Sequence, residues 1–268
     1  MTEQEFIRKL PAIDEYYVIM CDFTKQPYAE CDPETFDDKA FIFFEEKPAL
    51  DFVDDYKEDK MMLHVEKVAR TSILAFLTTL IVEGINMVCF RGEEEHNIQI
   101  EHIVTRQLKE GVPTPVENPT LQISMIYFMQ AVRTAETQEE RVIAKQFEEE
   151  MMVNIARATY LVPSKAVGEA DEEGNQKIAF YQVKNQNGDV FVPLFTDLNE
   201  FIKYQNMNKI TEQTMQFMPL KFNQIYDVYR QGMTGFIINP ATVAVLLNKQ
   251  HRLTYILHTT DFVLTSYV

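Results

Sequence analysis

A proline-rich segment near the middle of the chain constrains most strongly what this sequence can fold into. Residues 111–119, GVPTPVENP, place three prolines within nine residues. Because proline lacks the backbone N–H and fixes φ, neither a helix nor a central strand continues across such a segment. We therefore predict a domain at residues 1–110, a linker at residues 111–117 and a second domain at residues 118–268.

The residues that follow the linker predict a helical hairpin. Asn118 is a suitable N-cap for a helix whose first residue is Pro119, and apolar residues follow at helical spacing. A second helix is predicted to begin near Thr137, because Thr137 and Glu140 match a capping box. The second domain therefore opens with two helices.

Strands and further helices are predicted in the rest of the second domain. In chain order they are a short strand at 160–163 ended by a proline, a β-hairpin of 177–183 and 189–195, a short helix capped by Thr196 or Asp197, a helix with the apolar stripe of 222–229, and a buried strand at 235–238. Another helix is then predicted, capped by Asn239 and with Pro240 in its first turn.

The first half shows a diverged copy of this layout. Five positions match five others at one constant offset, namely Leu74, Leu77, Leu80, Ile81 and Gly84 with Phe222, Ile225, Val228, Tyr229 and Gly232. The fold class predicted is therefore α+β, with two tandem related repeats, each a mixed sheet with a β-hairpin and packed helices. The alternative is chance similarity between two strand–helix–strand segments.

The second half resembles the SseB-type family, named for enhanced serine sensitivity, over the amino-terminal domain of that family. The resemblance covers residues 118 to 250. The residues that carry it are Asn118-Pro-Thr-Leu121, Phe147, Tyr160-Leu-Val-Pro163, Val192-Pro-Leu-Phe-Thr196 with Leu198 and Phe201, and Gly235-Phe-Ile-Ile-Asn-Pro240.

The first half departs from the pattern of the family at two places. Glu45-Glu46 stand where the family has Phe-Thr, and Arg91-Gly92 stand where it has Asn-Pro. The first half is thus expected to be a diverged copy. The resemblance implies a cytoplasmic α+β module without established catalytic residues, so no residue role is carried over.

The charge of the chain excludes some classes of partner. The formal net charge is −16 at pH 7, which repels phosphate backbones and anionic lipid headgroups. Nucleic acid and membrane surfaces are therefore not expected as partners, whereas a basic or amphipathic segment of another protein is. The alternative is that the charge only keeps the protein soluble.

Cysteine usage and hydropathy favour the cytoplasm. The three cysteines are Cys21, Cys31 and Cys89, and they form no CxxC pair, so neither a disulfide framework nor a zinc knuckle is expected. The first ten residues lack the basic patch and apolar run of a secretory signal. The apolar stretch 72–82 is about half the length that a membrane span needs.

Two histidines are candidates for metal binding. Glu93-Glu-Glu-His96 followed by His102 supplies carboxylates and two imidazoles within ten residues. The alternative is an exposed acidic turn that leads into a strand at residues 97–103. On such a strand His102 shares a face with Ile98 and Ile100 and is a rim or core residue.

Asn239, with Gly235 nearby, is a candidate anion site or helix cap. The predicted helix that starts at Pro240 exposes backbone N–H groups, which could hold a phosphate or a carboxylate. No glycine-rich loop and no neighbouring Lys or Arg accompanies it, so ordinary capping by Asn239 is the alternative.

The sequence holds no catalytic motif, since no GxSxG turn, P-loop or GxGxxG occurs in it. We expect Cys89 to be buried and inert, and Cys21 to be more exposed. The function predicted is a non-enzymatic cytoplasmic protein-interaction module with no cofactor. The alternative is a small-molecule binder or hydrolase that uses the cleft between the repeats, and a homodimer is compatible with either.

Overall fold

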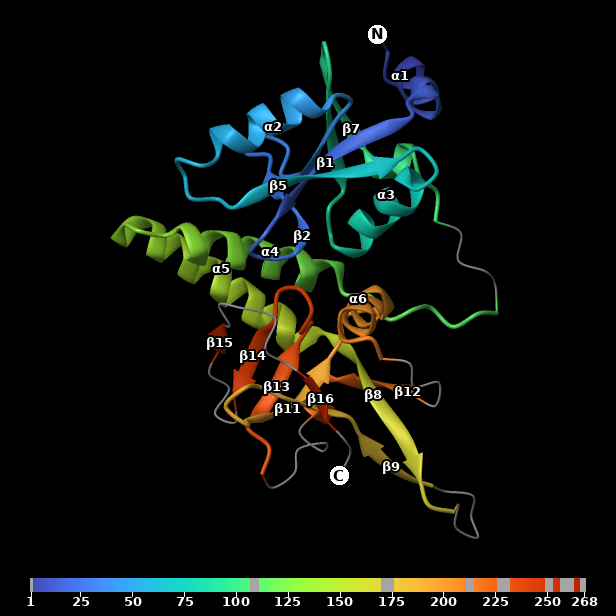
Figure 1. Cartoon of the computed structure of the whole chain (residues 1–268), viewed down its shortest axis with the longest axis vertical. Helices are drawn as coiled ribbons and strands as arrows, with labels where there is room; N and C mark the ends of the chain where they lie inside the picture. The colour runs from blue at the N-terminus through green and yellow to red at the C-terminus, as the bar shows by residue number, and fades with distance from the viewer. Residues whose placement is uncertain are drawn as a thin grey trace. The chain divides into compact units, whose positions relative to one another are not determined.

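The structure of the chain, a computed structural model, consists of two compact units (Figure 1). It describes residues 2–106, 111–169, 176–210, 215–225, 232–248, 253–255 and 263–265. The first unit comprises Met1–Thr114 and Pro119–Met152, and the second comprises Pro115–Asn118 and Val153–Val268. Each unit is described by itself below.

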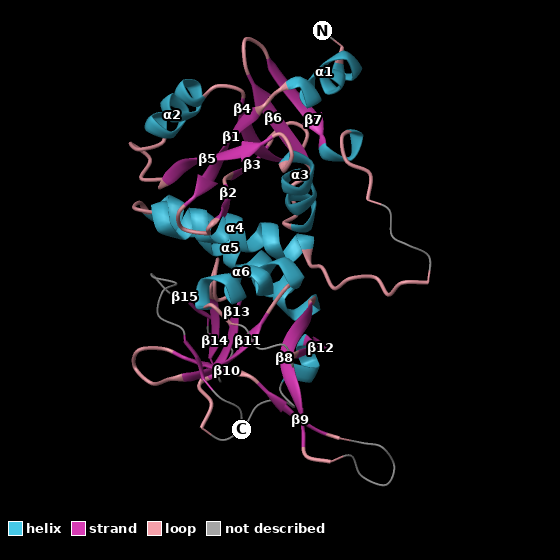
Figure 2. Cartoon of the chain, turned by 45° about the vertical axis from the view of Figure 1, so that its right-hand side comes forward, coloured by secondary structure: helices cyan, strands magenta, loops and turns pink. Residues whose placement is uncertain are grey.

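The first unit is built on a seven-stranded mixed sheet, whose strands are shown in Figure 2. Its strands are β1 (Glu15–Cys21), β2 (Gln26–Pro27), β3 (Ala29–Cys31), β4 (Asp38–Phe43), β5 (Leu63–Ala69), β6 (Met87–Arg91) and β7 (Glu95–Gln99). The order is β2-β1-β4-β6-β7, with β3 paired to β4 and β5 paired to β1. Strands β4 and β6 are parallel, and the other pairs are antiparallel.

Helices cover both faces of this sheet. They are α1 (Glu3–Lys9), η1 (Leu10–Ala12), α2 (Glu46–Asp55), α3 (Ile73–Val82), η2 (Ile100–His102) and α4 (Pro119–Thr134). On one face, α1, α3 and α4 pack with Ile42, Val88 and Phe90 of the sheet. On the other face, Phe52 of α2 packs with Phe41 and other residues of the sheet. The alternation of apolar side chains along β4 supplies both cores.

The predicted helical hairpin is formed, but most of it belongs to the first unit. Helix α5 (Gln138–Arg157) has the predicted capping box, because the N–H of Glu140 donates to Thr137 Oγ1 at 3.2 Å. Residues 119–152 group with the first half, which differs from the predicted boundary at residue 118. The reason is packing, since Ile123 and Ile126 of α4 join the same core as α3.

The second unit contains two sheets and helix α6 (Leu198–Asn208). Its strands are β8 (Thr159–Val167), β9 (Lys177–Phe180), β10 (Gln182–Lys184), β11 (Val190–Leu194), β12 (Gln216–Lys221), β13 (Gly235–Ile238), β14 (Val245–Asn248), β15 (Leu253–Tyr255) and β16 (Val263–Thr265). One sheet has the order β15-β14-β13-β11-β10-β16, and the other has the order β12-β8-β9. Strands β11 and β13 are parallel. Phe201 and Tyr204 of α6 pack into the core of this unit, and Asp197 caps the helix as predicted.

Four local predictions from the sequence differ from the structure. The strand predicted at 177–183 is interrupted at Tyr181, so β9 pairs with β8 in one sheet and β10 pairs with β11 in the other. Strand β8 does not end at Pro163 but continues to Val167, because β12 pairs with it as far as Ser164 and β9 pairs with residues 164–167. After β13 the chain makes a turn into β14, which pairs antiparallel with β13, so the helix predicted at Pro240 does not form. Of the helix predicted at residues 222–229, the structure describes η3 (Phe222–Gln224) and Ile225, and the rest lies outside the described residues.

The predicted α+β class is confirmed, because each unit combines mixed strands with helices packed on them. A relationship of the two halves as tandem repeats is not confirmed. Among the described residues, no helix has the length and the hydropathy that crossing a membrane requires.

Candidate functional site

A turn rich in carboxylates connects β3 to β4, and we call residues 32–38 the acidic turn. Four of its seven side chains are Asp or Glu. The Oδ1 atom of Asp32 accepts the backbone N–H groups of Glu34 at 2.9 Å and Thr35 at 3.1 Å. The N–H of Phe36 donates to the carbonyl of Asp32 at 2.8 Å. The turn is therefore held by its own first residue, as in an Asx turn.

These hydrogen bonds hold the pKa of Asp32 at about 2, with the N–H groups of Glu34 and Thr35 as the main causes and Lys39 Nζ as the next. Because the folded-state pKa lies below the ordinary value of about 4, the ionised carboxylate of Asp32 stabilises the turn above about pH 4. This stabilisation is lost as the pH falls through about 2. We expect an NMR titration to place the midpoint of Asp32 near pH 2. In a Lys39→Met control the midpoint should stay well below 4, because the two backbone donors remain. A midpoint near 4 in the wild type would contradict this account.

Phe36 is the most exposed large apolar side chain of the described residues. Its side chain is 78% exposed, although it lies among carboxylates. Its backbone has φ 61°, in the left-handed region, which a bulky residue adopts only at an energetic cost. The acidic turn thus presents an aromatic ring to solvent on a strained backbone. Such an outlier is a reason to consider function.

Asp37 connects the acidic turn to the start of β6 and the end of β7. Its Oδ1 atom accepts hydrogen bonds from Asn86 Nδ2 at 2.7 Å and from Gln99 Nε2 at 2.9 Å. The pKa of Asp37 is lowered, first by the bond from Gln99. The N–H of Asp38 donates to Asn86 Oδ1 at 2.8 Å, so both ends of the Asn86 amide are fixed. These hydrogen bonds therefore hold the acidic turn and the segments around Asn86 and Gln99 together as one frame of three connected segments.

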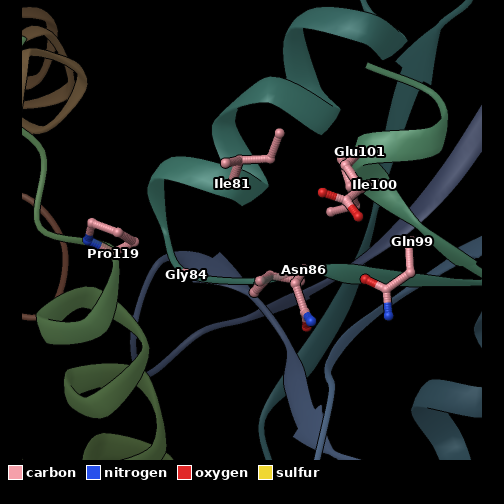
Figure 3. A pocket seen from close by; sticks show the side chains of 8 residues that line it. Ile81, Gly84, Asn86, Gln99, Ile100, Glu101 and Pro119 are labelled. Carbon is pink, nitrogen blue, oxygen red and sulfur yellow. The ribbon is translucent and has the colours of Figure 1, made fainter. Parts of the chain in front are cut away.

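A pocket of about 330 Å³ lies at this frame (Figure 3). It is formed by the end of α3, the segment before β6, the end of β7 with η2, and the first residue of α4. The lining residues are Ile81, Gly84, Ile85, Asn86, Gln99, Ile100, Glu101 and Pro119. All of them belong to the first unit. The walls are mainly apolar, and the two amides turn toward Asp37.

Among the described residues that line this pocket, Glu101 is the only one with an acidic side chain. It is exposed, and it makes no hydrogen bond or ion pair with any residue that the structure describes. Figure 3 shows its carboxylate turned toward the pocket. The pocket therefore combines apolar walls with one carboxylate that has no protein partner in the described chain.

The two candidate metal-binding histidines have separate partners. His96 lies on β7, with Nε2 3.7 Å from Glu94 Oε2 and its ring centroid 4.1 Å from that of Phe6. Strand β7 ends at Gln99, so His102 lies in η2 and not on the strand predicted at 97–103, and its Nδ1 is 2.7 Å from Glu3 Oε1. Within the described ranges, no group of three or more His, Cys, Asp or Glu side chains could hold a metal ion.

Asn239 is buried and belongs to a polar network inside the second unit. Its Nδ2 donates to Thr196 Oγ1 at 2.8 Å, and its Oδ1 accepts the N–H of Thr196 at 3.1 Å. Since no helix starts at Pro240, the helix N-terminus on which the predicted anion site or helix cap rested is absent. Gly235 is a buried residue of β13, paired with Phe191 of β11. Asn239 therefore fastens a turn and does not cap a helix.

Two buried carboxyl groups complete this network. Asp197 accepts the N–H of Glu200 at 3.1 Å and the hydroxyl of Thr196 at 2.9 Å. Glu200 accepts Lys203 Nζ at 3.0 Å and the hydroxyl of Thr242. The pKa of Asp197 is raised by burial and by the neighbouring Glu200. These groups join α6 to the turn after β13, which is a structural role.

The cysteines are free thiols with raised pKa values. Burial is the first cause for each, and it raises the pKa of Cys89 to about 11. Cys89 is buried as predicted, but Cys21 is also buried, because its side chain points into the core that α2 covers. Since the thiolate is the nucleophilic form, these shifts disfavour catalysis by cysteine at neutral pH.

Sequence reasoning did not single out Phe36 and Glu101. For Phe36 a signal was present, because the segment CDPETFDD places one aromatic residue inside an acidic, proline-containing turn. For Glu101 no local signal existed, since the pocket is closed by α4, which follows in the sequence after the proline-rich segment.

The fold and these features describe an α+β protein with an acidic, partly apolar surface in its first unit. Residues 135–251 match the SseB protein N-terminal domain, so this part of the chain carries an SseB-like domain, as the resemblance predicted. The match begins at residue 135 and leaves out Asn118-Pro-Thr-Leu121, which the resemblance had included. The match does not extend to the first half, and the diverged copy predicted there is not confirmed. The search of curated proteins found no match.

Two solved structures show a distant likeness to the chain. The Anabaena Tic22, described as a protein-transport protein, is 12% identical over 85% of each chain, with a TM-score of 0.22. Tic22 from Plasmodium falciparum is 13% identical over 87% of this chain and 90% of its own, also with a TM-score of 0.22. These values are too low to support a conclusion about fold or function.

Proposed function

We propose that the chain is a non-enzymatic protein-interaction module that binds a basic or amphipathic segment of another protein at the acidic turn. The observation that carries the proposal is Phe36, a largely exposed aromatic side chain held on a fixed turn among four carboxylates. Aromatic anchors surrounded by polar groups are typical of binding hot spots. The negative carboxylates are complementary in charge to the basic residues of such a partner.

The charge and the thiols support the same proposal. A net charge of −16 attracts basic segments and speeds their association. All three cysteines are free, which agrees with the reducing cytoplasm that we propose as the location. Their raised pKa values do not favour an enzyme that uses cysteine.

We also propose that the two units are related repeats. Strand β5 pairs antiparallel with β1, as β12 does with β8. In each unit a parallel pair follows, β4 with β6 and β11 with β13, and the next strand is antiparallel, β7 and β14. Equal pairing in equal order supports duplication. Superposition of the two units in an experimental structure tests it, and strands that fail to coincide in this order would contradict it.

Phe36→Gly is expected to weaken binding and to stabilise the fold. Glycine adopts the left-handed backbone freely, so we expect a gain of about 0.5–1 kcal/mol after its larger unfolded-state entropy is subtracted. Loss of the aromatic anchor should weaken binding of a helical lysine–leucine peptide by about tenfold. Fluorescence anisotropy with a labelled peptide measures the affinity, and chemical denaturation measures the stability.

The control is Leu74→Ala, which removes another exposed apolar side chain, 57% exposed, at the start of α3. It should change the affinity less than twofold. High salt should weaken binding to the wild type, because the charge attraction is screened. The proposal fails if the wild type does not bind the peptide at low salt, or if both variants bind as well as the wild type.

A further inference from the structure

The pocket beside the acidic turn has the features of a site for one long, positively charged side chain. Its volume of about 330 Å³ is at the lower end of the range for ligand pockets, about 300–1,000 Å³. This is too small for a large cofactor. Of its apolar lining residues, Ile85 and Ile100 are buried, so Ile81 and Pro119 present the accessible apolar surface, which suits methylene groups.

The electrostatics of the pocket favour a cation over an anion. The last turn of α3 and the first residue of α4 both line it, so a negative and a positive helix end meet there. Each end carries about half an elementary charge, and the two contributions largely cancel. Glu101 adds a full negative charge with no ion-pair partner among the described residues. Together with the nearby carboxylate of Asp37, it makes the field at the pocket negative.

The side-chain amides that line the pocket do not compete with a bound cation for the carboxylate of Glu101. The amide groups of Asn86 and Gln99 donate to Asp37, and Asn86 Oδ1 accepts the N–H of Asp38. These bonds also place the carboxylate of Asp37, which accepts them, beside the residues that line the pocket. The acidic turn and the pocket are thus parts of one surface.

We propose that this pocket binds a single lysine or arginine side chain of the basic partner segment, with the aliphatic stem against Ile81 and Pro119 and the cation at Glu101. The inference rests on the proposed function, which it deepens by naming the group recognised. Lysine and arginine side chains commonly bury their stems on apolar surface while the charged head stays near water. Phe36 is next in sequence to Asp37, which accepts hydrogen bonds from Asn86 and Gln99 of the pocket lining, so we assign both contacts to one partner segment.

The test uses small probes, so that it does not depend on the peptide experiment. Nα-acetyl-lysine methylamide and the corresponding arginine compound are titrated into the full chain, and backbone amide shifts of Asn86, Ile100 and Glu101 are followed by NMR. We expect saturable shifts with a dissociation constant in the millimolar range for at least one probe. The lysine probe acetylated at Nε, which keeps the stem but lacks the charge, should give no saturable shift.

Glu101→Gln should weaken binding of the charged probe by about tenfold, because it removes a charge-assisted bond and keeps the side-chain shape. The matched control is Glu66→Gln on β5, which also removes one negative charge, at an exposed position outside the pocket. It should leave the affinity within twofold. A spectrum unchanged away from residue 101 shows that the variant is folded.

The inference is overturned if neither charged probe shifts these amides, if the acetylated probe binds equally, or if the two variants weaken binding to the same extent. Failure of the proposed function gives a different result, since the lysine–leucine peptide then does not bind while the small probes still occupy the pocket. Peptide binding that is insensitive to Glu101→Gln contradicts the inference and leaves the proposed function intact.

Discussion

Asn239→Ala is expected to lower the free energy of unfolding by about 3 kcal/mol. The side chain of Asn239 accepts one hydrogen bond from Thr196 and donates another to it, and both residues are buried. Alanine leaves the N–H of Thr196 without this acceptor inside the protein, which costs about 1–3 kcal/mol. It also has to adopt φ 47°, where asparagine is tolerated and alanine costs about 1–2 kcal/mol. Chemical denaturation of the full chain measures the loss.

Asn239→Gly separates the two causes. Glycine adopts the left-handed backbone without strain but also removes both hydrogen bonds to Thr196. We therefore expect it to be less destabilising than alanine by about 1 kcal/mol. Equal losses for both variants would assign the whole effect to the hydrogen bonds. A loss below about 1 kcal/mol for alanine would show that the network around Thr196 does not hold the turn after β13.

The sequence was sufficient to predict those elements that depend on residues close together in the chain. The capping box of Thr137 and Glu140 and the cap of Asp197 are formed as predicted, because each depends on residues three positions apart. The same holds for the turn between β10 and β11, where the turn-rich run sets the pairing, although most of the predicted first strand forms β9 and pairs with β8. These elements follow from side chains that satisfy nearby backbone groups.

Asn239-Pro240 shows why local signals also mislead. An asparagine before a proline suits a helix start and a tight turn equally well. In the structure β14 pairs antiparallel with β13, and this pairing requires a turn and not a helix after Ile238. Neither the partner strand nor the bond to Thr196, 43 residues away in the sequence, is visible in the dipeptide.

The candidate site required tertiary information for most of its parts. The composition indicated the acidic character and the class of partner. The pocket at Glu101 exists because α4 packs beside α3, whereas the sequence pattern assigned the helical hairpin to the other half of the chain. An amphipathic helix shows that it has an apolar face, but not which core this face joins.

Gly84→Ala is expected to destabilise the first unit by about 3 kcal/mol or more and to change the pocket. A Cβ atom at Gly84 would lie 2.3 Å from the carbonyl oxygen of Pro119 and 2.9 Å from Cβ of Ile123. Both contacts are shorter than van der Waals distance, and one is with backbone, so α4 has to move away from α3. Overpacking of this kind costs about 1–3 kcal/mol, and φ 88° adds strain for any residue with a Cβ atom. Chemical denaturation measures the loss, and the amide shifts of Asn86 and Ile100 report the pocket.

The matched control is Gly188→Ala, in the turn between β10 and β11. Gly188 has φ 85°, close to that of Gly84, but a Cβ atom there would have no neighbour within 4 Å. It therefore reports the backbone strain alone, for which we expect about 1 kcal/mol. The difference between the two variants measures the contact of Gly84 with α4. Two results together would contradict this account: an equal loss of stability in both variants, and unchanged shifts of Asn86 and Ile100 in Gly84→Ala. They would show that α4 does not pack on Gly84 and that Pro119 does not form a wall of the pocket.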